Sequence, residues 1–169
     1  MMAKGPSAEE VAERAAALTA AEIAELVDRL SSKDDEVRFF AFRVLRRRSV
    51  IAPDVYPYWE RFSERLASDN SYQRSIGAML LAANVRWDAE RRFDAVVDAL
   101  AALFEDEKFV TARQAIQTVP EWIGFRPDLG EVVGAGLERI DLSTRKESQR
   151  GLLARDIAAA QAAIESVAG

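Results

Sequence analysis

An arginine recurs at a nearly fixed interval along this chain of 169 residues. The four copies are separated by 36, 39 and 37 residues, and each stands near the start of a segment that then becomes mainly apolar. They are Arg38, Arg74, Arg113 and Arg150. A fixed period of this size is typical of solenoids, in which each unit is one supersecondary element packed on the next. The interval therefore predicts a repeat architecture.

Apolar residues near each arginine follow the helical spacing of three and four positions. Ahead of Arg38, for example, Ile23, Leu26, Val27 and Leu30 would share one helix face. No segment alternates apolar and polar residues strictly enough to predict a strand. We therefore predict an all-α protein: a short right-handed α-solenoid of about four helical hairpins, preceded by one N-terminal helix.

The boundaries of these units can be placed from helix-start signals. Ser7 with Glu10, and Thr19 with Glu22, fit capping boxes, so helices should begin after Ser7 and Thr19. At this length one domain over 1–169 is expected. The predicted repeats cover approximately 20–50, 53–86, 89–123 and 127–167.

Composition limits the chemistry. The chain has no cysteine and no histidine, which excludes thiolate metal sites and any catalytic group built on His. Catalysis by carboxylates alone is not excluded by the composition. We nevertheless expect a protein that is not an enzyme and that has no metal site and no cofactor. No apolar run reaches the ~20 residues that span a membrane. The N-terminus lacks the apolar stretch of a secretory signal, so we expect a cytoplasmic protein.

Residues around the repeated arginines resemble HEAT-type repeats. The motif is an acidic residue, a turn, Val-Arg or a variant, and then small and aliphatic residues, as in "SKDDEVRFFAFRVL" and "ASDNSYQRSIGAMLL". The period is shorter than the ~40–47 residues usual for HEAT and armadillo units. The likeness covers about residues 20–160 and implies a scaffold for protein binding.

The segments "VYPYW", "DNSYQRSIG" and "TARQ" also resemble small bacterial HEAT-like proteins sometimes labelled SufBD. That label points to iron–sulfur assembly. We do not carry this function over, because the chain lacks cysteine and histidine and is predicted to be helical.

The recurrent arginines have two interpretations. In one, Arg38, Arg74, Arg113 and Arg150 line one face and bind an anionic ligand. In the other, each guanidinium bonds the turn or an acidic residue of its own or the neighbouring unit, with candidate acids three to six residues upstream. Recurrence in every unit favours the structural role, because binding rarely needs the same group four times.

Charge is unevenly distributed. Residues 1–36 carry a net charge of −5, residues 37–92 carry +5 and residues 93–169 carry −5. The basic middle includes Arg46 and Arg47 in "RVLRRR" and Arg86 in "VRWDAERR". Equivalent helix ends in a stack would bring these side chains onto one edge, where an acidic segment or a phosphate backbone could bind. A solvated edge is the alternative interpretation.

Further candidate contact residues lie on or just after the second helices. Trp87 either caps the core or presents an aromatic face beside Arg86. Second helices line the concave face in solenoids of this type, so unpaired polar side chains there are candidates for binding. They are Tyr72, Gln73, Gln114 and Gln117.

Three functions follow from this reasoning. The first is a non-enzymatic interaction module that binds an unknown protein, possibly through an acidic segment, on its concave face or basic edge. The second is DNA binding or a role similar to that of HEAT-like DNA alkylation-repair glycosylases, although their catalytic spacing is not matched and the net charge of −5 disfavours DNA. The third is a structural subunit that associates through its ends.

Overall fold

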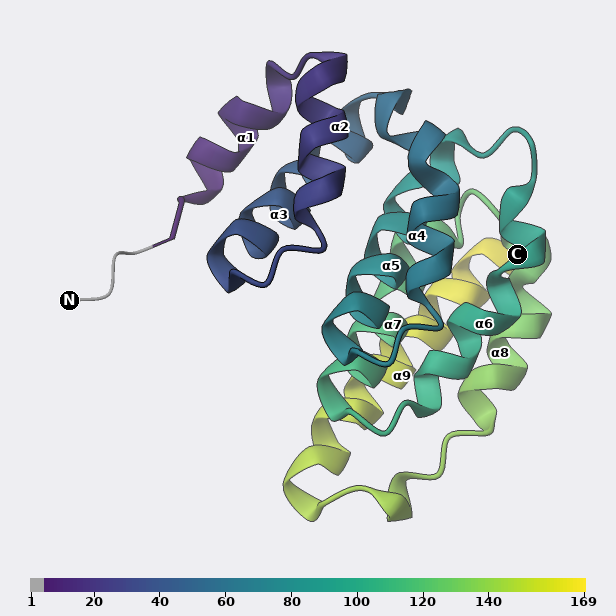
Figure 1. The fold of residues 1–169 in the computed structure, drawn as a ribbon. Coiled ribbons are helices and arrows are strands. Elements are labelled where there is room, and N and C mark those ends of the chain that lie inside the picture. The colour runs from purple at the N-terminus through teal and green to yellow at the C-terminus, as the bar shows by residue number, and fades with distance from the viewer. Residues whose placement is uncertain (1–4) are drawn as a thin grey trace.

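The computed structural model describes residues 5–169 (Figure 1). Within that range the chain forms nine α-helices and no strand, which confirms the predicted all-α class. The α-helices are α1 (Ala8–Ala16), α2 (Ala20–Arg29), α3 (Asp35–Ile51), α4 (Trp59–Arg65), α5 (Ser71–Asn84), α6 (Val97–Ala102), α7 (Phe109–Trp122), α8 (Gly130–Glu138) and α9 (Glu147–Ala168). Short 3₁₀ segments cover Pro53–Tyr58, Val85–Trp87, Arg92–Ala95, Leu103–Glu105, Pro127–Leu129 and Leu142–Thr144.

Both predicted capping boxes are confirmed. The hydroxyls of Ser7 and Thr19 accept hydrogen bonds from the backbone N–H of Glu10 and Glu22. Each glutamate carboxylate in turn accepts the N–H of its capping residue. Two otherwise unpaired backbone donors are satisfied at each end, which fixes where α1 and α2 begin.

The helices lie in two layers. In one layer α3, α5, α7 and α9 pack side by side in chain order, and α1 packs on the other side of α3. In the other layer α2, α4, α6 and α8 each pack on the helix that follows them in the chain. Figure 1 shows α4, α6 and α8 together on one side of α5, α7 and α9. The chain therefore alternates between the layers. The first hairpin is α2–α3, the second α4–α5, the third α6–α7 and the fourth α8–α9.

Prolines precede two helices of the layer that contains α2, α4, α6 and α8. Pro53 and Pro127 each begin a 3₁₀ segment that leads into α4 or α8, because a first helical turn tolerates the missing N–H. Pro120 lies inside α7, which continues to Trp122. The lost N–H falls in the final turn of α7, so only the end of the hydrogen-bond ladder is affected.

A row of aromatic rings connects the hairpins within the core. The Trp59 and Phe93 ring centroids lie 6.1 Å apart, and those of Phe93 and Trp122 lie 4.7 Å apart, both edge to face. All three side chains are almost fully buried. Edge-to-face pairs of this kind add ~0.5–1.5 kcal/mol beyond the area they bury. The Trp59–Phe93 pair joins two neighbouring hairpins, and the Phe93–Trp122 pair lies within the second of them.

Candidate functional site

The four recurrent arginines lie at equivalent places in the fold. Arg38, Arg74 and Arg150 are the fourth residues of α3, α5 and α9, and Arg113 is the fifth residue of α7. Three of them donate to a carbonyl of the turn that precedes their own helix. These bonds join Arg38 to Ser32 (3.0 Å), Arg74 to Ser68 (2.9 Å), and Arg150 to Arg145 (2.9 Å) and Ser143 (3.4 Å). These contacts are of the kind that the structural interpretation of the arginines requires.

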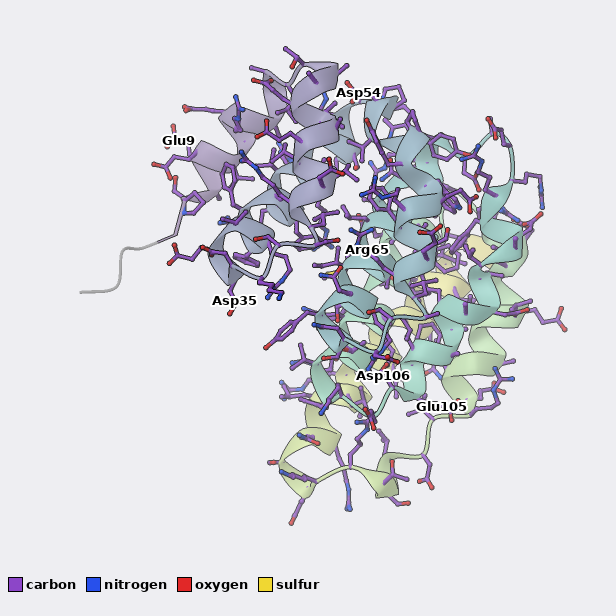
Figure 2. The ribbon with its side chains drawn as sticks, viewed as in Figure 1. Glu9, Asp35, Asp54, Arg65, Glu105 and Asp106 are labelled. Carbon is purple, nitrogen blue, oxygen red and sulfur yellow. The ribbon has the colours of Figure 1, made fainter. Side chains whose placement is uncertain are left out.

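Arg74 also bridges two hairpins. Its Nε and Nη2 donate to the two carboxylate oxygens of Asp106 at 2.8 and 2.9 Å, and Asp106 belongs to the turn before α7. Asp106 lies beside the start of α5 in Figure 2. Burial would raise the pKa of the Asp106 carboxyl, but hydrogen bonds from Arg74 and from the Lys108 N–H hold that pKa below its usual value.

Arg113 reaches a different element. Its Nε donates to Asp156 of α9 at 2.6 Å, and Gln117 one turn further along α7 donates to the same carboxylate at 3.1 Å. The acids paired with Arg74 and Arg113 are therefore supplied by the next hairpin. The candidate acids upstream of these two arginines are not their partners, and only Asp35, which pairs with Arg38, belongs to the expected set.

Much of the basic middle of the chain is paired within the molecule. Arg46 lies 3.3 Å from Glu121, and Arg48 makes a two-pronged contact with Asp54 at 2.7 and 2.9 Å. The Arg48 guanidinium lowers the pKa of the Asp54 carboxyl. Arg47 is exposed. The edge predicted from the charge pattern is thus less positive than the sequence alone indicates.

Arg86 and Trp87 serve the joint after α5. The indole N–H of Trp87 donates to the Ser49 carbonyl at 2.6 Å, which ties this segment to α3. Arg86 donates to the Ala83 carbonyl at 3.1 Å and lies over the Phe125 ring, 5.2 Å from its centroid. Both side chains are half-buried, and the contact of the Trp87 indole with α3 is of the kind that the capping interpretation requires.

Two of the polar candidates on the second helices are open to a groove, and two are engaged elsewhere. Tyr72 and Gln114 line the groove. Gln73 donates to the Leu30 carbonyl at 2.8 Å and accepts from Arg65 at 3.0 Å, so it joins the first two hairpins. Gln117 is bonded to Asp156, as described above.

The groove, of about 840 Å³, crosses the N-terminal halves of α3, α5 and α7 and reaches the start of α9. Its apolar lining includes Phe39, Tyr72 and Val110, whose exposed fractions are 57%, 66% and 59%. Four cationic residues and two acidic ones also line it: Arg38, Lys108, Arg145 and Lys146 against Asp35 and Glu107. The groove combines an apolar surface with an excess of positive charge.

Sequence reasoning missed Phe39, Val110 and the cations before α9. A signal for Phe39 existed, because Phe39 and Phe40 are adjacent and one helix face cannot bury both. The cations Arg145 and Lys146 come from a turn 107 and 108 residues beyond Arg38, and nothing in the local sequence places them beside it.

Other functional features are absent from the part of the chain that the structure describes. Residues 5–169 contain no cluster of three or more acidic side chains able to hold a metal ion. No helix among them is long and apolar enough to cross a bilayer. Compared with known proteins, the chain matches no protein-family model and no curated protein.

Proposed function

We propose that this chain is a HEAT-type repeat protein, a short right-handed α-solenoid that binds another protein and catalyses no reaction. The interval of the repeated arginines and the two helix layers, each built in chain order, support this architecture. Stacked hairpins of this kind present extended surfaces on which partners dock.

The groove across α3, α5 and α7 carries the proposal. Phe39, Tyr72 and Val110 each leave more than half of their surface in water, and they gather on neighbouring helices over one hollow. Apolar residues grouped in this way mark interaction sites more often than isolated ones do. The partner segment that fits them has apolar side chains flanked by Asp or Glu, which would face Lys108, Arg145 and Lys146.

Protein suits this surface better than nucleic acid does. A phosphate backbone is held by free Lys and Arg side chains. Here Arg46, Arg48 and Arg74 are paired with carboxylates of the same chain. The exposed side chains in the groove are largely apolar, which is the chemistry of a peptide contact.

Selection from a random peptide display library tests the proposal. We expect the selected peptides to combine apolar residues with Asp or Glu, and to bind Tyr72→Ala/Val110→Ser at least tenfold more weakly than the unaltered protein. The control Phe125→Ala/Val132→Ser alters two exposed apolar residues outside the groove and should bind normally. Equal loss in both variants, or selected peptides without acidic residues, would contradict it.

A salt-titrated binding assay with duplex DNA tests the alternative that the chain binds nucleic acid. We expect no binding even at low salt, where phosphate contacts are strongest. Salt-sensitive binding that disappears in Arg47→Glu would favour the nucleic-acid alternative instead.

A further inference from the structure

A second hollow, of about 640 Å³, lies between the first two hairpins. It is bounded by the turn before α3, the end of α4 and the turn before α5, and its lining is mainly polar. Four cationic side chains and two acidic ones face it: Lys33, Arg38, Arg61 and Arg65 against Asp35 and Glu64. In Figure 2, Arg65 lies between the hairpin that carries Asp35 and the hairpin that follows.

Arg65 is an unusual lining residue because its guanidinium is buried without a counter-ion. Only 9% of Arg65 is exposed, and within residues 5–169 no carboxylate pairs with it. Its donors go to neutral acceptors: the Gln73 amide oxygen at 3.0 Å, the Ser31 hydroxyl at 3.1 Å and the Arg61 carbonyl. A guanidinium has five N–H groups, so two remain without a protein acceptor.

A buried cation without a counter-ion destabilises the folded state unless an anion accompanies it. Burial, reinforced by the nearby charge of Arg61, lowers the pKa of the Arg65 guanidinium. A buried guanidinium that lines a hollow and keeps N–H donors without protein acceptors is the arrangement expected of an anion site.

The junction between the second and third hairpins contains a carboxylate that the junction between the first and second lacks. Ser32, Ser68 and Asp106 occupy the same place three residues before α3, α5 and α7. Each side chain accepts the N–H of the residue two positions later, at 3.1, 3.2 and 2.9 Å. Between the second and third hairpins, Arg74 binds the carboxylate of Asp106. Between the first and second, the equivalent residue is Ser68, which has a hydroxyl in place of the carboxylate, and the acid paired with Arg38 is Asp35 of its own helix.

We propose that the hollow binds a phosphate group, which takes the place of the missing carboxylate between the first two hairpins. Arg65 would donate its two free N–H groups, Arg38 would turn toward the same anion, and the hydroxyls of Ser31 and Ser68 would donate to further oxygens.

Phosphate fits the hollow better than a carboxylate does. The Asp106 carboxylate needs only the Arg74 guanidinium and one backbone N–H as donors. Here donors approach from two hairpins, and a phosphate group offers three or four oxygens and a charge of about −1.5 to −2. The Asp35 side chain is 86% exposed and Glu64 is also exposed, so both acids can turn to water when an anion enters.

A comparison of Ser68→Asp with Ser68→Asn tests the site. Both side chains can accept the Asn70 N–H as Ser68 does, and only aspartate adds the carboxylate present at the next junction. At constant ionic strength, about 20 mM inorganic phosphate should raise the midpoint of thermal unfolding by about 5 °C in the unaltered protein and in Ser68→Asn. Ser68→Asp should show no such rise, because its carboxylate occupies the site.

Calorimetric titration gives the second measurement. Inorganic phosphate should bind once per chain with a Kd below about 1 mM, and at least tenfold more weakly to Ser68→Asp. No binding to the unaltered protein, or equal binding to Ser68→Asp and Ser68→Asn, would overturn the proposal.

The source of the phosphate is distinguished by a short peptide containing phosphoserine and its unphosphorylated form. Binding of the phosphopeptide at least tenfold tighter than inorganic phosphate would identify a phosphorylated protein as the ligand. Equal affinity would identify free phosphate or a small phosphate ester. Equal binding of both peptide forms would show that the phosphate group is not recognised, and would overturn the proposal. The two hollows share Asp35, Arg38 and Tyr72, but Ser68 lines only the polar one, so the Ser68 variants test the phosphate site separately from the apolar groove.

Discussion

The first three hairpins meet at two junctions. Each junction has an arginine near a helix start and a turn residue of the next hairpin, but only the second junction forms an ion pair between them. At the second junction Arg74 of α5 meets Asp106, and the pair is closed: their side chains are 13% and 6% exposed. At the first junction Ser68 stands where Asp106 stands in the second, and Arg38 pairs with Asp35 of its own helix. Arg38 and Ser68 both line a polar hollow beside Arg65, which has no carboxylate partner among the described residues. One position in the turn separates a structural contact from a candidate binding site. The proposed phosphate site thus rests on the absence, at the first junction, of the carboxylate that the second junction contains.

The largest effect is expected when the second junction is made to lose its carboxylate. Asp106→Asn keeps the acceptor for the Lys108 N–H but leaves Arg74 without a counter-ion in a mostly buried place. We expect the free energy of unfolding to fall by about 3 kcal/mol, measured by urea denaturation. The matched control is Asp141→Asn, which keeps the same kind of turn bond to Ser143 and loses no ion pair. The control should change stability by less than about 0.5 kcal/mol.

Acid should erase the difference between the junctions. The folded-state pKa of Asp106 lies below its ordinary value of 3.8, so the ionised carboxylate stabilises the fold at every pH above the unfolded-state value. That stability is lost as the pH falls through the lowered pKa and the carboxyl takes up a proton. The stability gap between the unaltered protein and Asp106→Asn should be constant from pH 7 to about 5, and should shrink below about pH 3.8. A gap independent of pH would show that the ion pair contributes nothing.

Gly77 should matter for the packing beneath the first junction. A Cβ on Gly77 would lie 2.7 Å from the Phe62 carbonyl oxygen and 2.9 Å from the Arg65 Cβ. Alanine would favour the helix by ~1 kcal/mol, but α4 would have to move away from α5. We expect Gly77→Ala to lower the free energy of unfolding by about 1–2 kcal/mol and to weaken phosphate binding, since Arg65 would shift.

The matched control for Gly77→Ala is Gly134→Ala in α8, where an added Cβ would meet nothing within 4 Å. It should be neutral or slightly stabilising, because only the helix propensity changes. Destabilisation of the same size in both variants would show that the close approach of α4 and α5 is not the cause.

The helices and the core were accessible from the sequence because their signals are local. The capping box at Thr19 needs four consecutive residues, and the burial of Ile23, Leu26 and Val27 follows from their helical spacing. Periodicity averages over many residues, so single exceptions do not obscure it.

The contacts between hairpins were not accessible in the same way. Arg74 and Asp106 are 32 residues apart and Arg46 and Glu121 are 75 apart, so neither pair leaves a local pattern. From the sequence we predicted acidic partners upstream of each arginine. We also predicted a basic band from the net charge of residues 37–92, a count that does not include ion pairs with distant acids. Ser68 lines the hollow at the first junction. Its importance can be recognised only from the structure, where the equivalent residue Asp106 forms an ion pair with Arg74.

The smallest effect is expected at the last copy of the arginine motif. Arg150 occupies the same helix position as Arg74, but it is exposed and donates only to backbone carbonyls. No hairpin follows α9 within the described residues, so no acid reaches Arg150 from a next unit. Arg150→Ala should change the free energy of unfolding by less than about 0.5 kcal/mol, whereas Arg74→Ala should approach the effect of Asp106→Asn. Equal effects at both positions would mean that the turn carbonyls, which both arginines bind, carry the motif's stabilising role. A large difference would mean that the contact with the next hairpin carries the stabilising role.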